Sequence, residues 1–141
     1  MNEKAMQLIK KFEGNSLVPY RCPAGHLTIG WGHRIRPYES FTSLTLAETD
    51  ILLERDLYAA ECVLVKLVRV PLDLSQEGAL LSFIFNVGAG AFQRSTLRMK
   101  VNRQDHAEVP AEFHRWVWAK GQKLPGLRVR RAVEAAYYEG L

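Results

Sequence analysis

Residues 12–33 contain three side chains whose types could carry out acid–base hydrolysis, namely Glu13, Cys22 and Thr28. A carboxylic acid can donate a proton to a leaving group, and a hydroxyl can donate and accept hydrogen bonds when it orients water. Cys22 stands where a second carboxylate would be natural, although a free thiol is mostly protonated at neutral pH and Asp is ionised. Taken singly, the same residues also fit a solvated Glu, an ordinary strand Thr and a half-buried thiol.

The elements around these residues predict a small lobe that combines a helix with a hairpin. Asn2 can start a helix that ends at Glu13, because Gly14 is a natural stop. Over residues 14–44, Pro and Gly interrupt alternating apolar residues, as is typical of a small twisted hairpin. One strand face is expected to carry Leu27, Ile29 and Trp31, and the other Thr28 and Gly30.

A long helix is predicted to follow over residues 45–68. Thr45 and Glu48 have the spacing of a capping box at its start. The charged residues of this segment exclude a membrane span. Its residues at core spacing are Leu53, Leu57, Ala60, Leu64 and Leu67.

The last part of the chain predicts an all-helical lobe. Ser75 can cap a very apolar helix over residues 79–87, which we expect at the centre of this lobe. Further helices are expected from Ser95 and Thr96, over 106–118 and over 128–138, with a turn at 123–127.

The predicted fold class is therefore α+β and mainly α-helical. We expect one domain over residues 1–141, in which the helix at 45–68 connects the hairpin lobe at 14–44 with a helical lobe. The helical lobe comprises residues 71–141 together with the N-terminal helix at 2–13, and a cleft lies between the two lobes.

Composition narrows the functional classes. With 141 residues, a net charge of +4 and 24% charged residues, the chain is ordinary for a globular protein. Its basic residues are scattered among acids until the last fifth of the chain, which argues against a nucleic-acid binder. Cys22 and Cys62 form no C-x-x-C pair, and no Cys/His cluster has ligand spacing, so we expect no disulfide framework, metal or cofactor. We expect Cys62 to be a small packing residue of the long helix.

Three ordered blocks resemble the phage-type lysozymes, glycoside hydrolase family 24. The spacing of Glu13, Cys22 and Thr28 is similar to that family's Glu, then Asp or Cys, then Thr. The block "LTIGWGH" resembles its T-x-G-x-G-H hairpin, and "ALLSFIFNVGAGAFQRSTL" and "LPGLRVRR" match later blocks. The resemblance covers nearly the whole chain. It implies a lysozyme-like fold and hydrolysis, with inversion, of the β-1,4 bond between N-acetylmuramic acid and N-acetylglucosamine in peptidoglycan.

The resemblance also implies roles for the three site residues and for supporting ones. Glu13 would protonate the glycosidic oxygen, and Cys22 and Thr28 would position and help activate the attacking water. Arg130, with Arg131 as second choice, resembles the basic residue that the family's last helix points at the catalytic Glu. His33 is interpreted as a structural residue of the hairpin, paired with Asp56 of the long helix.

Substrate-binding residues are expected along the cleft. Hairpin glycines would let the glycan approach closely, and residues at the end of the central apolar helix and after its glycine break would contact sugars. This predicted set is Gly30, Gly32, Asn86, Phe92 and Gln93. Phe92 fits core packing equally well. Trp116 and Trp118 are expected in the core, since they lie in an apolar stretch.

The resemblance favours a monomeric endolysin that degrades peptidoglycan for host-cell lysis. Because no export signal is recognised, the enzyme would wait in the host cytoplasm and reach the periplasm through a holin pore. No nucleic-acid partner and no stable membrane insertion are expected. The alternative is a peptidoglycan-binding protein with weak or lost catalysis in a phage tail or secretion apparatus, and Cys22 keeps this alternative open.

Overall fold

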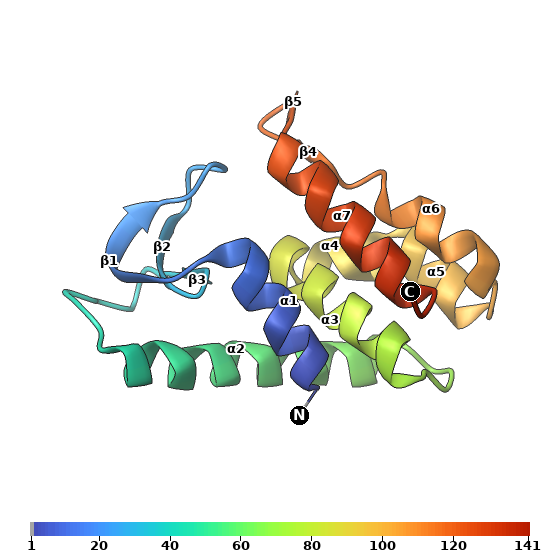
Figure 1. Ribbon diagram of the computed structural model, residues 1–141, viewed down its shortest axis with the longest axis horizontal. Helices are drawn as coiled ribbons and strands as arrows, with labels where there is room; N and C mark the ends of the chain where they lie inside the picture. The colour runs from blue at the N-terminus through green and yellow to red at the C-terminus, as the bar shows by residue number, and fades with distance from the viewer. Residues whose placement is uncertain (1) are drawn as a thin grey trace.

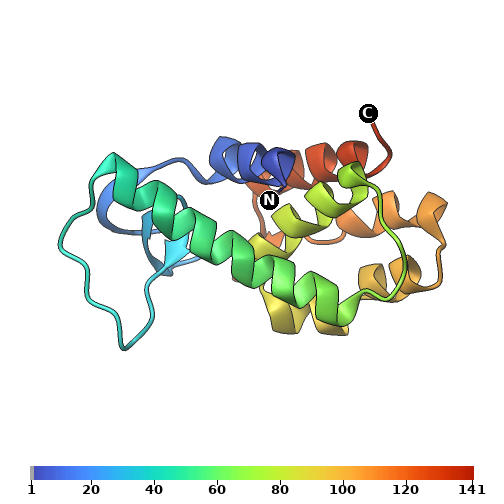
Figure 2. The same ribbon diagram turned by 90° about the horizontal axis from the view of Figure 1, so that it is seen from below.

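Residues 2–141, which the computed structural model describes, form mostly helices with two small antiparallel sheets (Figure 1). The long helix α2 runs below the sheet β1–β2–β3 and the other helices in Figure 1, and Figure 2, seen from below, shows it in front of them. The expected mainly helical α+β class is confirmed. In chain order the elements are α1 (Glu3–Glu13), β1 (Ser16–Arg21), β2 (Leu27–Gly30), β3 (His33–Arg34), α2 (Leu46–Leu67), α3 (Leu74–Val87), α4 (Ala89–Arg94), α5 (Thr96–Asn102), the 3₁₀ helix η1 (His106–Glu108), α6 (Val109–Phe113), β4 (Trp118–Ala119), β5 (Gln122–Lys123) and α7 (Pro125–Tyr138).

Helix α1 begins and ends as its sequence predicts. The Asn2 side chain accepts a hydrogen bond from the Ala5 amide at 2.9 Å, which satisfies one of the free N–H groups of the first turn. Gly14 follows the last residue with φ +65°, a conformation that favours glycine. Because the helix stops there, Glu13 lies at its end, next to the hairpin.

The hairpin sheet has the order β1–β2–β3 and is antiparallel throughout. Tyr20 pairs with Thr28, and the register shifts between Ser16 and Tyr20. The expected alternation along β2 is wrong in part: Thr28 and Ile29 are both buried, whereas Leu27 is 40% exposed. The reason is that no continuous layer covers one face of this small sheet. Helix α2 packs against part of it, and Thr28 faces the cleft between the lobes.

Helix α2 carries the predicted capping box, in which Thr45 and Glu48 exchange side-chain and backbone bonds. The predicted core residues of this helix, from Leu53 to Leu67, are all buried. Cys62, however, is exposed, so its assignment as a packing residue is wrong. No helix within residues 2–141 combines the length and apolar character that crossing a membrane requires.

Helix α3 forms the centre of the helical lobe, packed against α1, α2 and α7. Every residue from Gly78 to Ile84 is buried. The cap is Asp73 rather than Ser75, because Asp73 and Gln76 form a complete capping box and start the helix earlier.

The end of the chain departs from the expected run of helices. Residues 106–118 form a 3₁₀ turn and the short helix α6, and then Trp118 enters a two-stranded hairpin. Lys120 and Gly121 make the turn of this hairpin, both with positive φ, as a two-residue type I′ turn requires. Helix α7 starts at Pro125, before the expected residue 128, because proline fits the first helical position.

Candidate active site

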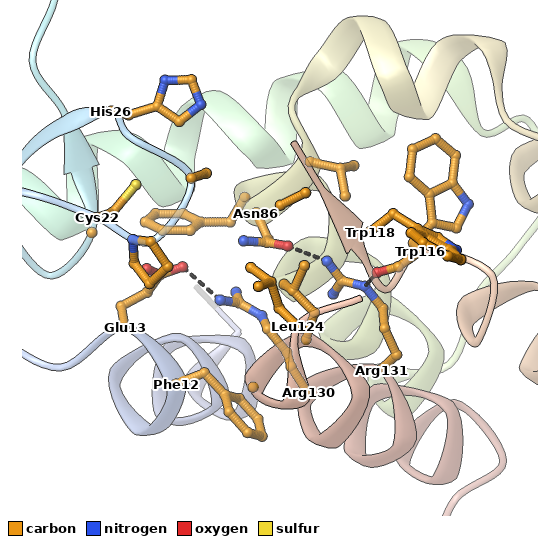
Figure 3. Close-up of a pocket in the computed structure, with 18 of the residues that line it drawn as sticks. Phe12, Glu13, Cys22, His26, Asn86, Trp116, Trp118, Leu124, Arg130 and Arg131 are labelled. Atoms are coloured by element: carbon orange, nitrogen blue, oxygen red, sulfur yellow. Dashed lines mark hydrogen bonds and ion pairs between the residues drawn. The ribbon is translucent and has the colours of Figure 1, made fainter. Parts of the chain in front are cut away.

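A cleft of about 770 Å³ lies between the hairpin lobe and the helical lobe. One wall consists of the end of α1, the β1–β2 turn and β3; the other consists of the end of α3, the β4–β5 hairpin and the start of α7 (Figure 3). Glu13, Cys22 and Thr28 all line this cleft, so the structure brings the three predicted residues together. Glu13 is the only carboxylate among the lining residues that the structure describes.

The Glu13 carboxylate meets Arg130 of α7 across the cleft. Arg130 Nη1 donates to Glu13 Oε2 at 2.5 Å, and the arginine side chain is only 4% exposed. The remaining nitrogens of Arg130 are also bound, Nη2 to the Ser82 carbonyl at 3.1 Å and Nε to Glu134 at 3.3 Å. The guanidinium is thus held rigidly, and one oxygen of Glu13 is held with it. Arg130 lies where the sequence predicts; its role in catalysis stays a prediction.

Gly32 lies directly behind the Glu13 carboxyl group. A Cβ atom at this position would lie 2.5 Å from Glu13 Oε1 and 2.6 Å from its Cδ. The residue also has φ +76°, which strains any other L-residue. Gly32 does line the cleft, but the carboxyl group occupies the space beside it, so the glycine accommodates Glu13 first of all.

A single carbonyl oxygen holds the other two predicted residues. The His26 carbonyl accepts the backbone N–H of Cys22 at 2.9 Å and the Thr28 hydroxyl at 2.8 Å. The Gly25 amide closes the turn by donating to the Cys22 carbonyl at 2.7 Å. Since the proton of the Thr28 hydroxyl is engaged, its oxygen has lone pairs that can accept a hydrogen bond from water.

Two titratable hairpin residues near the site were missed in the sequence. Partial burial, with Glu13 and Cys22 close by, raises the pKa of Tyr20, so the phenol stays protonated. The Arg34 guanidinium, together with slight burial and Lys120, lowers the pKa of His26, so this ring is neutral at pH 7. Neither residue belongs to the matched triad, and only the strand pairing places them beside it.

Asn86 lies at the end of α3 and lines the cleft, as its predicted role in substrate binding requires. Its side-chain oxygen accepts a hydrogen bond from Arg131 Nη2. Its backbone carbonyl accepts from Arg34 Nη2 at 3.0 Å, which links the hairpin lobe to the helical lobe. Contact of Asn86 with sugar stays a prediction.

Three of the predicted substrate-binding residues lie elsewhere. Phe92 is completely buried and packs edge-on against Phe83 in the core, so its assignment to sugar binding is wrong. Gly30 is buried against Thr49 of α2, with φ +63°, and serves the packing of the sheet rather than the cleft. Gln93 is exposed on α4, outside the cleft lining.

The β4–β5 hairpin adds residues that the sequence analysis placed incorrectly. Trp118 is 58% exposed and lines the cleft, so its expected core position is wrong, whereas Trp116 packs against the core and also reaches the cleft. At the hairpin tip, the Lys120 side chain crosses to the β1–β2 turn, where its ammonium group occupies the space that a side chain at Gly25 would need. The sequence signal for this hairpin was the turn Lys120–Gly121, which contains a glycine and lies between the short segments Trp118–Ala119 and Gln122–Lys123.

His33 is clamped between two carboxylates, one predicted and one new. His33 Nδ1 lies 2.7 Å from Asp56 Oδ2, which confirms the predicted pairing with α2, and Nε2 lies 2.9 Å from Glu39 Oε1. Burial of the ring opposes its protonation, but the hydrogen bonds to Asp56 and Glu39 outweigh burial and raise the pKa of His33. The clamp joins β3 to α2 and supports the hairpin wall of the cleft.

Across residues 2–141, no group of three or more His, Cys, Asp or Glu side chains is placed to hold a metal ion.

Comparisons with known proteins show the family of this chain. The phage lysozyme family model matches residues 10–134. The endolysin of Acyrthosiphon pisum secondary endosymbiont phage 1 is 37% identical over 143 residues, covering 99% of this chain and 97% of that protein. The SAR-endolysin of Escherichia phage Mu is 40% identical over 136 residues, covering 96% and 79%. Among solved structures, the muramidase domain of SpmX from Asticaccaulis excentricus has a TM-score of 0.83 and 33% identity, covering 95% and 93%. The chain belongs to the phage lysozyme family.

Proposed function

We propose that this chain is an endolysin of the muramidase type, with Glu13 as the proton donor. Membership of the phage lysozyme family and similarity to endolysins support hydrolysis of bacterial peptidoglycan in host-cell lysis. The observation that supports the assignment of the site is the placement of Glu13, the one carboxylate among the described cleft residues, in the same cleft as Cys22 and Thr28.

In the proposed reaction, protonated Glu13 donates its proton to the glycosidic oxygen between N-acetylmuramic acid and N-acetylglucosamine. A water molecule that hydrogen-bonds to Thr28 Oγ1 and Cys22 Sγ attacks the anomeric carbon from the opposite face as the bond to the leaving oxygen breaks, which inverts the configuration. The proton that this water loses passes to the solvent, from which Glu13 is protonated again for the next cycle. Arg130 then stabilises the carboxylate that Glu13 becomes, since the two groups already lie 2.5 Å apart.

The test compares wild type and Glu13→Gln in cell-wall clearing and in release of new reducing ends from purified peptidoglycan. Because general acid catalysis contributes about 10²–10⁴-fold, the variant should lose at least about 100-fold in rate with an unchanged thermal transition. NMR of the first product should show the inverted anomer. Glu13→Gln with near-wild-type turnover would refute the role of Glu13. A wild type that binds cell walls without cutting them would favour the peptidoglycan-binding alternative.

The route to the cell wall and the oligomeric state rest on the family resemblance alone. We propose that the enzyme is held in the host cytoplasm, passes through a holin pore and acts as a monomer. Expression in host cells with and without a holin, followed by turbidity, tests the release step, and light scattering of the purified protein tests the oligomeric state.

A further inference from the structure

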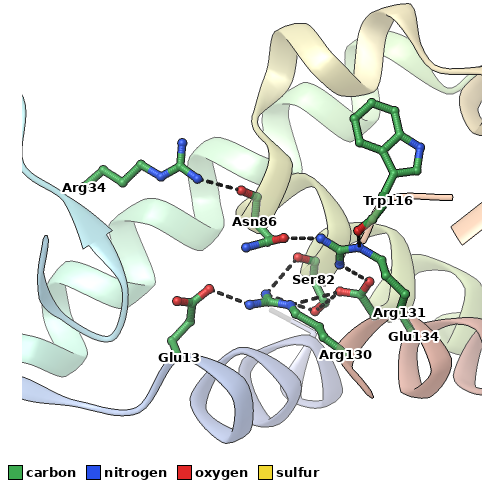
Figure 4. A network of polar contacts seen from close by, with 8 residues as sticks. All are labelled: Glu13, Arg34, Ser82, Asn86, Trp116, Arg130, Arg131 and Glu134. Atoms are coloured by element: carbon green, nitrogen blue, oxygen red, sulfur yellow. Dashed lines mark hydrogen bonds and ion pairs between the residues drawn. The ribbon is translucent and has the colours of Figure 1, made fainter. Parts of the chain in front are cut away.

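Behind the cleft, a buried network of charged groups converges on Glu134 of α7 (Figure 4). The Glu134 side chain is 0% exposed, and Arg131 beside it is 1% exposed. Glu134 Oε1 accepts from Arg131 Nη1 at 2.5 Å, and Oε2 accepts from Ser82 Oγ at 2.6 Å and from Arg130 Nε at 3.3 Å. Burying a carboxylate away from water is costly unless it is paired, and these three donors pair Glu134.

Each arginine connects Glu134 to a different wall residue of the cleft. Arg130 reaches Glu13, and Arg131 reaches Asn86 (Figure 4). Burial lowers the pKa of Arg131, and the Glu134 carboxylate opposes this effect. Arginine side chains carry a positive charge in proteins. The network then contains two positive and two negative groups, and Glu134 supplies half of the negative charge.

We infer that Glu134 is a positioning residue for the hydrolysis, which neutralises the second buried arginine so that Glu13 is not the sole counter-charge for two guanidinium groups. The inference rests on the proposed function of Glu13 as proton donor. A proton donor must be able to hold its proton at the working pH, and each uncompensated positive charge nearby favours the ionised carboxylate instead.

Other groups around Glu13 do not replace this charge. Tyr20 lies close to Glu13 and stays protonated. The titratable or charged residues that line the cleft with Glu13 are Cys22, His26 and Arg34 from the hairpin lobe, Lys120 from the β4–β5 turn, and Arg130 and Arg131 from α7. No further carboxylate is among the described lining residues, so Glu134 is the negative charge that balances the arginines from behind.

The test is the pH dependence of peptidoglycan cleavage in wild type, Glu134→Gln and Arg131→Gln. Glu134→Gln leaves an excess positive charge, so the loss of activity on the alkaline side should begin about one pH unit lower, with activity at pH 7.5 down about fivefold to tenfold. Arg131→Gln leaves an excess negative charge and should move the same limb to higher pH. The matched control is Glu112→Gln, which removes another buried carboxylate, bound to Lys100 at 2.8 Å in the same lobe. It should lower thermal stability and leave the limb in place.

Opposite shifts in the two α7 variants, with no shift in the control, support the inference. Alkaline limbs that coincide with wild type, or that move in the same direction in both variants, overturn it. A packing defect alone would not shift the limb in opposite directions in the two variants. If Glu134→Gln is too unstable to purify, two other variants decide the question. Arg131→Gln should move the alkaline limb to higher pH, and the double variant Glu134→Gln/Arg131→Gln, which removes one charge of each sign, should have an alkaline limb close to that of wild type. An active wild type with unmoved limbs refutes this inference alone, whereas a wild type that binds peptidoglycan without cutting it refutes the proposed function as well.

Discussion

Replacing Asp56 by Asn should destabilise the protein markedly in mild acid and only slightly at alkaline pH. Each ring nitrogen of His33 faces a carboxylate, and an ionised carboxylate can only accept, so the bound ring carries two protons. The Asp56 side chain is 23% exposed and that of His33 is 7% exposed, which places the pair mostly out of water. A hydrogen bond to a charged partner contributes about 1.5–3 kcal/mol, so we expect a loss of about 2 kcal/mol near pH 5.5. For a chain of this size, this loss corresponds to a Tm lower by roughly 6 °C.

The pH dependence follows from the direction of the pKa shift. The folded pKa of His33 is raised, so its contribution to stability is fully present below the unfolded value of about 6.5 and is lost as pH rises through the folded value. Burial opposes the ionisation of Glu39, but the Arg36 amide and His33 outweigh it and lower the pKa of Glu39, so this part of the clamp is lost in stronger acid. The clamp should therefore stabilise the fold most between about pH 5 and 6.5.

Urea unfolding followed by circular dichroism at pH 5.5 and pH 9 measures both losses. Asp50→Asn on the same helix is the matched control, because Asp50 accepts from Trp31 Nε1 at 2.8 Å and pairs with Lys10 at 3.3 Å, and no histidine takes part in either contact. Its effect should be the same at both pH values. An Asp56→Asn loss that is equal at pH 5.5 and pH 9, or larger at pH 9, would refute the charged clamp.

Two further predictions concern the cleft. Cys22→Ala should lower the rate of cell-wall clearing about tenfold, and Cys22→Asp should restore activity and extend it to lower pH, because a carboxylate stays ionised there. The control Cys62→Ser, on the exposed side of α2, should match wild type. A fully active Cys22→Ala would show that the thiol has no part in catalysis. Gly32→Ala should lower turnover about tenfold or more by displacing the Glu13 carboxyl group, and the positive φ should cost at least about 1 kcal/mol in unfolding free energy. Unchanged turnover would show that the carboxyl group can shift freely.

The features that local chemistry determines were predictable from the sequence. The cap at Asn2, the capping box at Thr45 and the apolar period of α2 depend on residues within a few positions of one another. The pairing of His33 with Asp56 and the approach of Arg130 to Glu13 came from the family resemblance, because no local pattern relates residues so far apart.

The errors arose where distant parts of the chain decide the outcome. Phe92 lies on a six-residue helix, whose buried face is set by the neighbouring elements rather than by its own sequence. Trp118 belongs to a strand of two residues, which exists only through its partner strand. Glu134 reads locally as a polar residue of a terminal helix, and only the positions of Arg131 and Ser82 show that it is buried.

The crossing of Lys120 to the turn at Gly25 bears on how a polymer enters the enzyme. A glycan strand in the cell wall is continuous and anchored along its length, so it offers few free ends that could be threaded beneath a closed bridge. The bridge here is one exposed side chain rather than backbone, and exposed side chains change rotamer in picoseconds to nanoseconds. Sideways entry of the middle of a strand past this bridge therefore requires a rotamer change of Lys120, a motion far faster than a movement of whole lobes.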